Sequence, residues 1–131
     1  AARNKNLDYR LTIKNKDSYI HSDRDFFTKI LYNLFSNGIK YSESYFEIIL
    51  YPTDTESRIK FEFINDGELI PEEAFSKIFQ PFYRFEKTEI REGSGIGLSF
   101  AYSLIRLLKG SLTVTVNSGK NIFTLTIPTK F

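Results

Sequence analysis

Cysteine, methionine and tryptophan are absent from the 131-residue sequence, and histidine occurs once, as His21. The absence of cysteine excludes disulfide scaffolds and thiolate metal sites, and it permits a reducing compartment without requiring one. Long apolar runs are also absent, since no segment approaches the ~20 residues that cross a membrane as a helix. The chain opens with neither a methionine nor a signal peptide, and we expect a soluble piece of a larger protein.

A surplus of charge of one sign is missing as well. The 18 Lys and Arg residues oppose 16 Asp and Glu residues, which gives a formal net charge of +2. Because the basic residues are dispersed among acidic ones, no stripe is available to contact a phosphate backbone, and we expect no nucleic-acid binding. Repeats, low-complexity segments and linkers are absent, so residues 1–131 should form one domain with a hydrophobic core.

Five apolar segments have the pattern of short strands, and four of them alternate apolar with polar residues as strands with one buried face do. The predicted strands are residues 7–13, 46–50, 59–63, 112–116 and 123–127, and residues 18–20 are a further candidate. Polar turns separate the second strand from the third and the fourth from the fifth, the latter turn at residues 117–121. Each of these pairs should therefore form a hairpin.

Three other stretches place apolar residues at three- and four-residue spacing, which predicts helices. The helices are residues 23–41, residues 71–79, and a third that follows a glycine-rich loop and ends at Lys109 and Gly110. About five one-faced strands and three one-striped helices predict a two-layer α/β sandwich of the α+β class. The helices should cover one face of a mixed, or wholly antiparallel, sheet.

The first of these helices carries an unusual polar stripe. Asn33, Asn37 and Tyr41 recur at four-residue spacing beside Lys40, although asparagine is a poor residue for a helix interior. One interpretation is a partly solvated stripe beside the core. The other is a ligand site, because carboxamide oxygens suit Mg²⁺, lysine suits phosphate, and a tyrosine ring suits a base. The second interpretation describes an ATP site.

A glycine-rich loop leads into the last helix. Such a loop lets backbone N–H groups approach an anion, and the helix N-terminus that follows favours negative charge. Alone it could equally be a tight turn. It lacks the Gly-Lys-Ser/Thr of a P-loop, and neither an adjoining strand nor a βαβ unit surrounds it as in a dinucleotide site. The loop residues are Gly93, Ser94, Gly95, Ile96, Gly97 and Leu98.

Four motifs in order resemble those of the catalytic, ATP-binding domain of sensor histidine kinases. Residues 33–42 resemble the N box of that family, residues 65–71 the G1 box, residues 79–84 the F box and residues 93–99 the G2 box. The likeness covers nearly the whole chain. It is closest to the hybrid two-component kinases, whose G1 box often reads Asn-Asp-Gly.

The resemblance implies the Bergerat fold, which gyrase, Hsp90 and MutL ATPases share, and it implies ATP and Mg²⁺ as cofactors. It places Asn37 as the metal ligand with Asn33 assisting, Lys40 on phosphate and Tyr41 on the adenine. Asn33, Asn37 and Lys40 are thus the expected catalytic residues. Gyrase-like ATPases carry a glutamate at the position of Asn33. Because asparagine cannot act as a general base, transfer to an outside nucleophile is favoured over hydrolysis.

The G1 box departs from the common pattern of the family, Asp-x-Gly-x-Gly. Its adenine-reading aspartate is replaced by Asn65, a neutral and weaker acceptor, and its second glycine is Leu69. Asp66 is the alternative reader if the turn is shifted by one residue. A lid is expected at about residues 85–93, with Arg84 at its base. The further nucleotide-binding residues that the resemblance implies are Gly67, Ile70, Phe82, Arg84, Gly93, Ser94, Gly95, Ile96, Gly97 and Leu98.

In the family, the phosphoryl acceptor is a histidine of a separate dimerising helical domain, and a response-regulator receiver acts downstream. His21 lacks the flanking pattern of that acceptor, so this domain, a monomer by itself, should bind ATP but transfer nothing alone. It should be a cytoplasmic domain of a parent anchored in the inner membrane. Two alternatives remain, namely a docking module that has lost nucleotide and a serine kinase of the anti-sigma type.

Overall fold

The computed structural model describes residues 8–13, 24–52, 58–83 and 97–128. Its elements in chain order are β1 (Asp8–Ile13), α1 (Arg24–Tyr41), β2 (Tyr45–Pro52), β3 (Arg58–Asn65), the 3₁₀ helix η1 (Glu72–Ala74), α2 (Gly97–Leu107), β4 (Ser111–Asn117) and β5 (Lys120–Pro128). All five predicted strands and the first and last predicted helices are present, with ends that differ by a few residues. The candidate strand at 18–20 lies outside the described residues.

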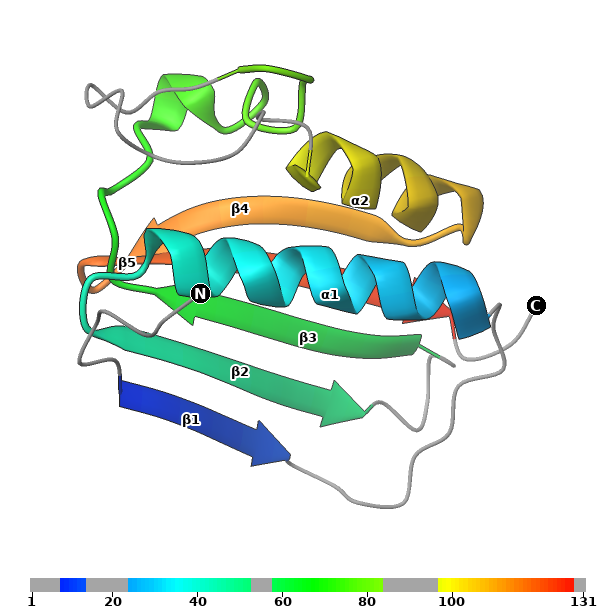
Figure 1. The fold of residues 1–131 in the computed structure, drawn as a ribbon, viewed down its shortest axis with the longest axis horizontal. Helices are drawn as coiled ribbons and strands as arrows, with labels where there is room; N and C mark the ends of the chain where they lie inside the picture. The colour runs from blue at the N-terminus through cyan, green and yellow to red at the C-terminus, as the bar shows by residue number, and fades with distance from the viewer. Residues whose placement is uncertain (1–7, 14–23, 53–57, 84–96, 129–131) are drawn as a thin grey trace.

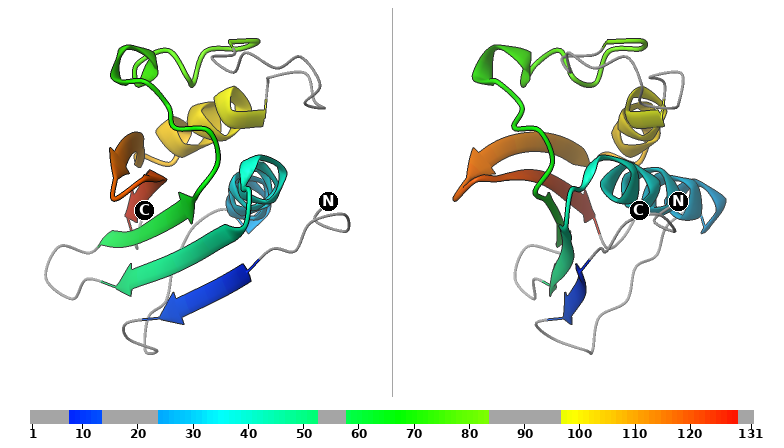
Figure 2. Two further views of the ribbon diagram at one scale, coloured as in Figure 1. Left: turned by 90° about the vertical axis from the view of Figure 1, so that its left-hand side faces the viewer. Right: turned by 60° about the vertical axis from the view of Figure 1, so that its left-hand side comes forward.

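The five strands of the described residues form one mixed sheet in the order β1-β2-β3-β5-β4. The edge strand β1 is parallel to β2, and every other neighbouring pair is antiparallel. Both predicted hairpins are therefore confirmed. Figures 1 and 2 show α1 and α2 side by side over one face of the sheet. The predicted two-layer α+β sandwich is confirmed, and the mixed sheet replaces the antiparallel alternative.

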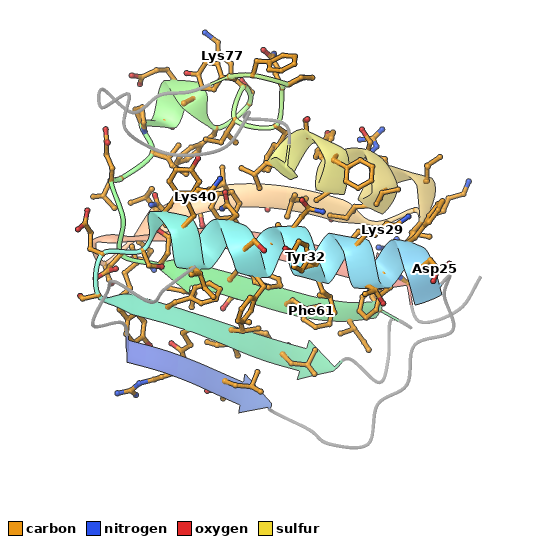
Figure 3. The ribbon with its side chains drawn as sticks, viewed as in Figure 1. Asp25, Lys29, Tyr32, Lys40, Phe61 and Lys77 are labelled. Carbon is orange, nitrogen blue, oxygen red and sulfur yellow. The ribbon has the colours of Figure 1, made fainter. Side chains whose placement is uncertain are left out.

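The core lies between the sheet and the two helices. In β3 the inward residues alternate with partly exposed ones, and the same period continues in β5, as expected for strands with one covered face. The Phe61 ring of β3 lies beneath α1, 5.9 Å from the ring of Phe27 (Figure 3). The buried core side chains include Ile30, Leu34, Ile59, Phe61, Phe63, Ala101, Leu104, Ile105, Leu125 and Ile127.

The prediction of an α-helix at residues 71–79 is wrong. The structure has only η1 there, followed by turns, so the described residues contain two α-helices rather than three. The hydrogen bonds explain the difference, since most of them join residues three apart, as from the Phe75 N–H to the Glu72 oxygen. Runs of this tighter geometry are short. Pro81 cannot donate the backbone bond that would continue a helix.

Neither α-helix of the described part is both long enough and apolar enough to cross a membrane.

The end of β3 and the end of α1 meet on one side of the molecule (Figure 1). Gly67, just beyond β3, packs so closely on the main chain that any side chain there would overlap the Tyr41 carbonyl oxygen. The first residues of β5 lie at this same side, because Asn121 is directly opposite Asn65 in the β3–β5 register. Residues far apart in the sequence are thereby brought together around the C-terminal end of α1.

Candidate functional site

Asn33 is held in a fixed orientation on α1. Its Nδ2 donates a hydrogen bond of 2.8 Å to the Lys29 carbonyl oxygen one turn earlier, so its Oδ1 is the polar atom that remains available. That Oδ1 lies 3.3 Å from the position a Cβ atom would take at Gly97, the first residue of α2. The structure therefore brings the asparagine stripe of α1 close to Gly97, the last glycine of the glycine-rich sequence.

Asn37 and Lys40 continue the stripe toward the end of α1. Asn37 is half-buried, and its side chain has no hydrogen-bond partner among the described residues. The Lys40 Nζ lies 5.7 Å from the centroid of the Tyr41 ring. Figure 3 shows Lys40 at the opposite end of α1 from Asp25 and Lys29. Amide oxygen, ammonium and aromatic ring thus follow one another along the C-terminal half of the helix.

The Asp66 carboxylate is hydrogen-bonded to the main chain of the turn that follows α1. Its carboxylate accepts bonds from the N–H groups of Glu43, Ser44 and Tyr45 at 2.9 to 3.0 Å, and from the Ser44 hydroxyl at 2.6 Å. Partial burial alone would raise the pKa of this carboxyl, but these bonds outweigh that effect and lower the pKa to about 2. Asp66 therefore ties the turn after α1 to the end of β3.

Asn65 lies deeper, on the helix-facing side of β3, with only 3% of its surface exposed. Its Oδ1 accepts two hydrogen bonds, one from the Gly67 N–H at 2.9 Å and one from the Asn121 Nδ2 at 3.1 Å. Asn121 in turn accepts the Ile70 N–H at 2.9 Å through its own Oδ1, and its Nδ2 also donates to the Glu68 carbonyl at 3.0 Å. The two asparagines hold the whole G1 turn in place.

Asn121 is the site residue that the sequence reasoning missed. Residues 117–121 were expected to form a turn, but the turn is confined to Ser118 and Gly119, and Asn121 belongs to β5, where it is 2% exposed. A signal for this existed. The two-residue period of Phe123, Leu125 and Ile127 extends back to Asn121 and places it on the buried face.

The remaining candidate nucleotide-binding residues differ in burial, and several lie outside the described residues. Ile70 is buried, Leu98 packs partly buried against the core, and Phe82 is 71% exposed with a left-handed φ of 67°. The ring of Phe79 from the F box instead packs inward, stacked on Tyr102 with centroids 5.1 Å apart. Six expected features lie outside the described residues, namely Arg84, Gly93, Ser94, Gly95, Ile96 and the lid at 85–93.

The polar groups present fit a magnesium nucleotide better than a metal held by protein carboxylates. Across the described ranges, no group of three or more His, Cys, Asp or Glu side chains is placed to hold a metal ion. The oriented Oδ1 of Asn33 and the carboxamide of Asn37, which has no partner within the described ranges, offer hard oxygen ligands. Mg²⁺ commonly takes one or two such protein ligands together with substrate phosphates.

Comparison with known proteins agrees with this geometry. Residues 22–130 match the family described as histidine kinase-, DNA gyrase B-, and HSP90-like ATPase. Sensor protein GtcS of Aneurinibacillus migulanus is 34% identical over 110 residues, covering 84% of this chain and 30% of that protein. The hybrid signal transduction protein dokA of Dictyostelium discoideum is 36% identical over 101 residues, covering 72% and 6%. The chain thus spans less than a third of either relative.

Solved structures give the same picture. The nucleotide-free catalytic domain of histidine kinase ThkA superposes with a TM-score of 0.82 at 27% identity, covering 98% of this chain and 84% of that one. ThkA has also been solved in complex with the response regulator protein TrrA, and there the TM-score is 0.77 at 26% identity, covering 98% and 36%.

Proposed function

Because this chain belongs to the histidine kinase-, DNA gyrase B- and HSP90-like ATPase family, we propose that it binds Mg-ATP and holds the γ-phosphoryl group for a histidine of a separate domain. The family and its sensor-kinase relatives support an ATP-binding kinase domain of two-component signalling. The observation that supports the finer proposal is the approach of the Asn33 Oδ1 to Gly97, because in the proposal Asn33 serves the metal and Gly97 ends the loop that serves the phosphates.

In this proposal, Asn37 holds Mg²⁺ and Asn33 assists, with Lys40 directed to phosphate and Tyr41 to the base. Mg²⁺, when bound, neutralises the charge of the phosphate oxygens. The protein's own part is to position the nucleotide. Asn33 and Asn37 carry no group that can remove a proton from water. Transfer of the γ-phosphoryl group to an external nucleophile is therefore favoured over hydrolysis.

The base is assigned to Asn65 rather than to Asp66. All five hydrogen bonds that the Asp66 carboxylate accepts in the described part of the chain come from residues 43–45, and moving the carboxylate toward a ligand would break the turn. Asn65 is the remaining polar side chain of the G1 box that faces the helix layer. Gly67, Ile70, Phe82, Arg84, Gly93, Ser94, Gly95, Ile96, Gly97 and Leu98 complete the proposed set.

The proposed acceptor is the histidine of a dimerising helical domain, followed by a response-regulator receiver. A hybrid relative and the complex of ThkA with TrrA support this choice. We further propose that the domain is cytoplasmic, is a monomer by itself, and belongs to a parent anchored in the inner membrane.

Calorimetric titration with ATP, with and without Mg²⁺, tests the proposal. We expect binding that depends on Mg²⁺, and we expect Asn37→Ala to weaken it at least tenfold because the variant lacks the principal metal ligand. Asn117→Ala is the matched control, since Asn117 is exposed at the β4–β5 turn, and it should bind like the unmodified chain. Absence of binding at millimolar ATP would favour the docking module instead. Equal affinity in Asn37→Ala would refute the metal assignment.

A further inference from the structure

The orientation of the Asn65 carboxamide is dictated by backbone groups. The Gly67 N–H requires an oxygen opposite it, and that atom is the Asn65 Oδ1. The orientation of Asn121 is fixed in the same way, because the Ile70 N–H requires an oxygen and the Glu68 carbonyl requires an N–H. Reversing either side chain would set donor against donor. The pair therefore has one arrangement.

This arrangement leaves Asn65 with only a donor to offer. A carbonyl oxygen has two lone pairs, and those of the Asn65 Oδ1 receive the Gly67 N–H and the Asn121 Nδ2. The Asn65 Nδ2 has no hydrogen-bond partner in the part of the chain that the structure describes, and the side chain is 97% buried, since 3% is exposed. Buried donors are normally paired, so an acceptor on a ligand is the natural complement.

The unpaired amino group lies at the base end of the proposed nucleotide site. Asn65 continues the inward row of Ile59, Phe61 and Phe63 on β3 and so faces the helix layer. The Gly67 turn beside it is in close contact with the Tyr41 carbonyl at the end of α1. The inference that follows rests on the proposed function, because it concerns the nucleotide that this site holds.

We propose that Asn65 presents an N–H donor to the base, and that the site binds 6-oxopurine nucleoside triphosphates at least as tightly as ATP. The 6-amino group of adenine is a donor, whereas the 6-oxo group of hypoxanthine or guanine is an acceptor. The proposal places the Asn65 Nδ2 opposite position 6, where a donor facing the amino group of adenine gains nothing and a donor facing an oxo group makes a hydrogen bond. Opposite N1 the preference would be reversed, because N1 is an acceptor in adenine and carries a proton in hypoxanthine. Asn121 is the positioning residue that keeps the oxygen of Asn65 turned away from the base.

Calorimetric titration with Mg-ATP and Mg-ITP provides the test. The two nucleotides differ only at the 6-position and in the proton on N1, so ribose, phosphate and metal contacts cancel in the ratio of dissociation constants. For the unmodified chain we expect ITP to bind as tightly as ATP or more tightly. Asn65→Asp keeps the shape and supplies a second acceptor oxygen, and it should shift the ratio at least tenfold toward ATP.

Asn117→Asp is the control for charge, because it adds the same charge to the same residue type at an exposed site, and it should leave the ratio unchanged. A preference of the unmodified chain for ATP beyond the experimental error would overturn the inference, and ATP binding as proposed above would still stand. Absence of binding by both nucleotides would overturn both. The ratio for the unmodified chain decides the matter even if Asn65→Asp does not fold.

Discussion

Two asparagines of the site are oriented by the main chain in opposite senses. Asn33 gives its amino group to the Lys29 carbonyl and so presents oxygen. Asn65 gives its oxygen to the Gly67 N–H and the Asn121 amide and so presents an amino group. In the proposed site, asparagine therefore supplies a hard oxygen ligand at the metal end through Asn33 and a donor at the base end through Asn65. The hydrogen bonds to neighbouring groups thus determine whether each asparagine presents its oxygen or its amino group.

Asp66 ties the turn after α1 to the end of β3, and its removal should lower the stability of the fold. Its pKa in the folded protein is about 2, below the ordinary value of 3.8. A lowered pKa adds stability that is complete above about pH 5 and is lost as the pH falls toward 2. The carboxylate is partly open to solvent, which screens it. Asp66→Asn should therefore cost about 1–2 kcal/mol of unfolding free energy at pH 7.

Urea denaturation at pH 7, 4 and 3 measures this contribution. The unmodified chain should lose stability as the pH falls below about 5, and Asp66→Asn should lose less over the same interval, because it has no carboxyl to protonate at this position. Glu73→Gln, at an exposed position in η1, is the control and should follow the unmodified chain. Parallel curves for Asp66→Asn and the unmodified chain would contradict the assigned role.

At the scale of elements, Gly38 sets how closely α1 lies on the sheet. A Cβ atom at this position would overlap the ring of Phe46 in β2, and Phe46 is buried. Glycine within a helix costs about 1 kcal/mol relative to alanine, but here it permits the contact. Because the ring has little room to move, we expect Gly38→Ala to lower the free energy of unfolding by about 1–3 kcal/mol despite its better helix propensity.

Denaturation of Gly38→Ala alone and combined with Phe46→Leu tests this packing. Leucine is smaller than phenylalanine and leaves room for the added methyl group. Gly38→Ala should therefore cost less free energy of unfolding in the Phe46→Leu background than it does in the unmodified chain. Ser36→Ala, two residues earlier on α1, controls for the change in helix propensity. A Gly38→Ala variant more stable than the unmodified chain would show that α1 can move away from β2 at no cost.

The elements were largely predictable because their periods are local. The two-residue period marks β1, β3, β4 and β5, and the helical period marks α1 and α2. The helix predicted at 71–79 is the exception. Ala74, Phe75 and Ile78 have helical spacing, but the chain forms only a single 3₁₀ turn followed by further turns. The spacing of apolar residues does not indicate how many backbone hydrogen bonds a short segment can form.

The joining of Asn65 to Asn121 could not be predicted from either residue. They are 56 residues apart, and their contact depends on the β3–β5 register. A slip of one residue in that register would turn Asn121 to the other face of the sheet. The partners of Asp66 lie 21 to 23 residues earlier in the chain. Local patterns identify such polar residues, but tertiary pairing decides which of their atoms remain for a ligand.

At the scale of the whole molecule, the proposed site is an assembly of distant segments, and we expect none of its described residues to activate water. It draws on α1, the end of β3, the start of β5 and the first residue of α2, and the residues proposed at the phosphate end are amides and an amine. Carboxamides cannot activate water. We therefore expect the chain alone to hydrolyse ATP no faster than its Asn37→Ala variant does, measured as phosphate release.

Phosphoryl transfer should begin only when an acceptor is supplied. Incubation with γ-labelled ATP and a separately produced dimerising helical domain that carries the acceptor histidine should place an acid-labile label on that domain, because a phosphorylated imidazole nitrogen is cleaved in acid. Asn37→Ala should abolish the label, and Asn117→Ala should not. An acid-stable label would identify a hydroxyl acceptor and favour the serine kinase. Asn37-dependent phosphate release without any acceptor would instead mean that water is activated by a group other than the two amides on α1.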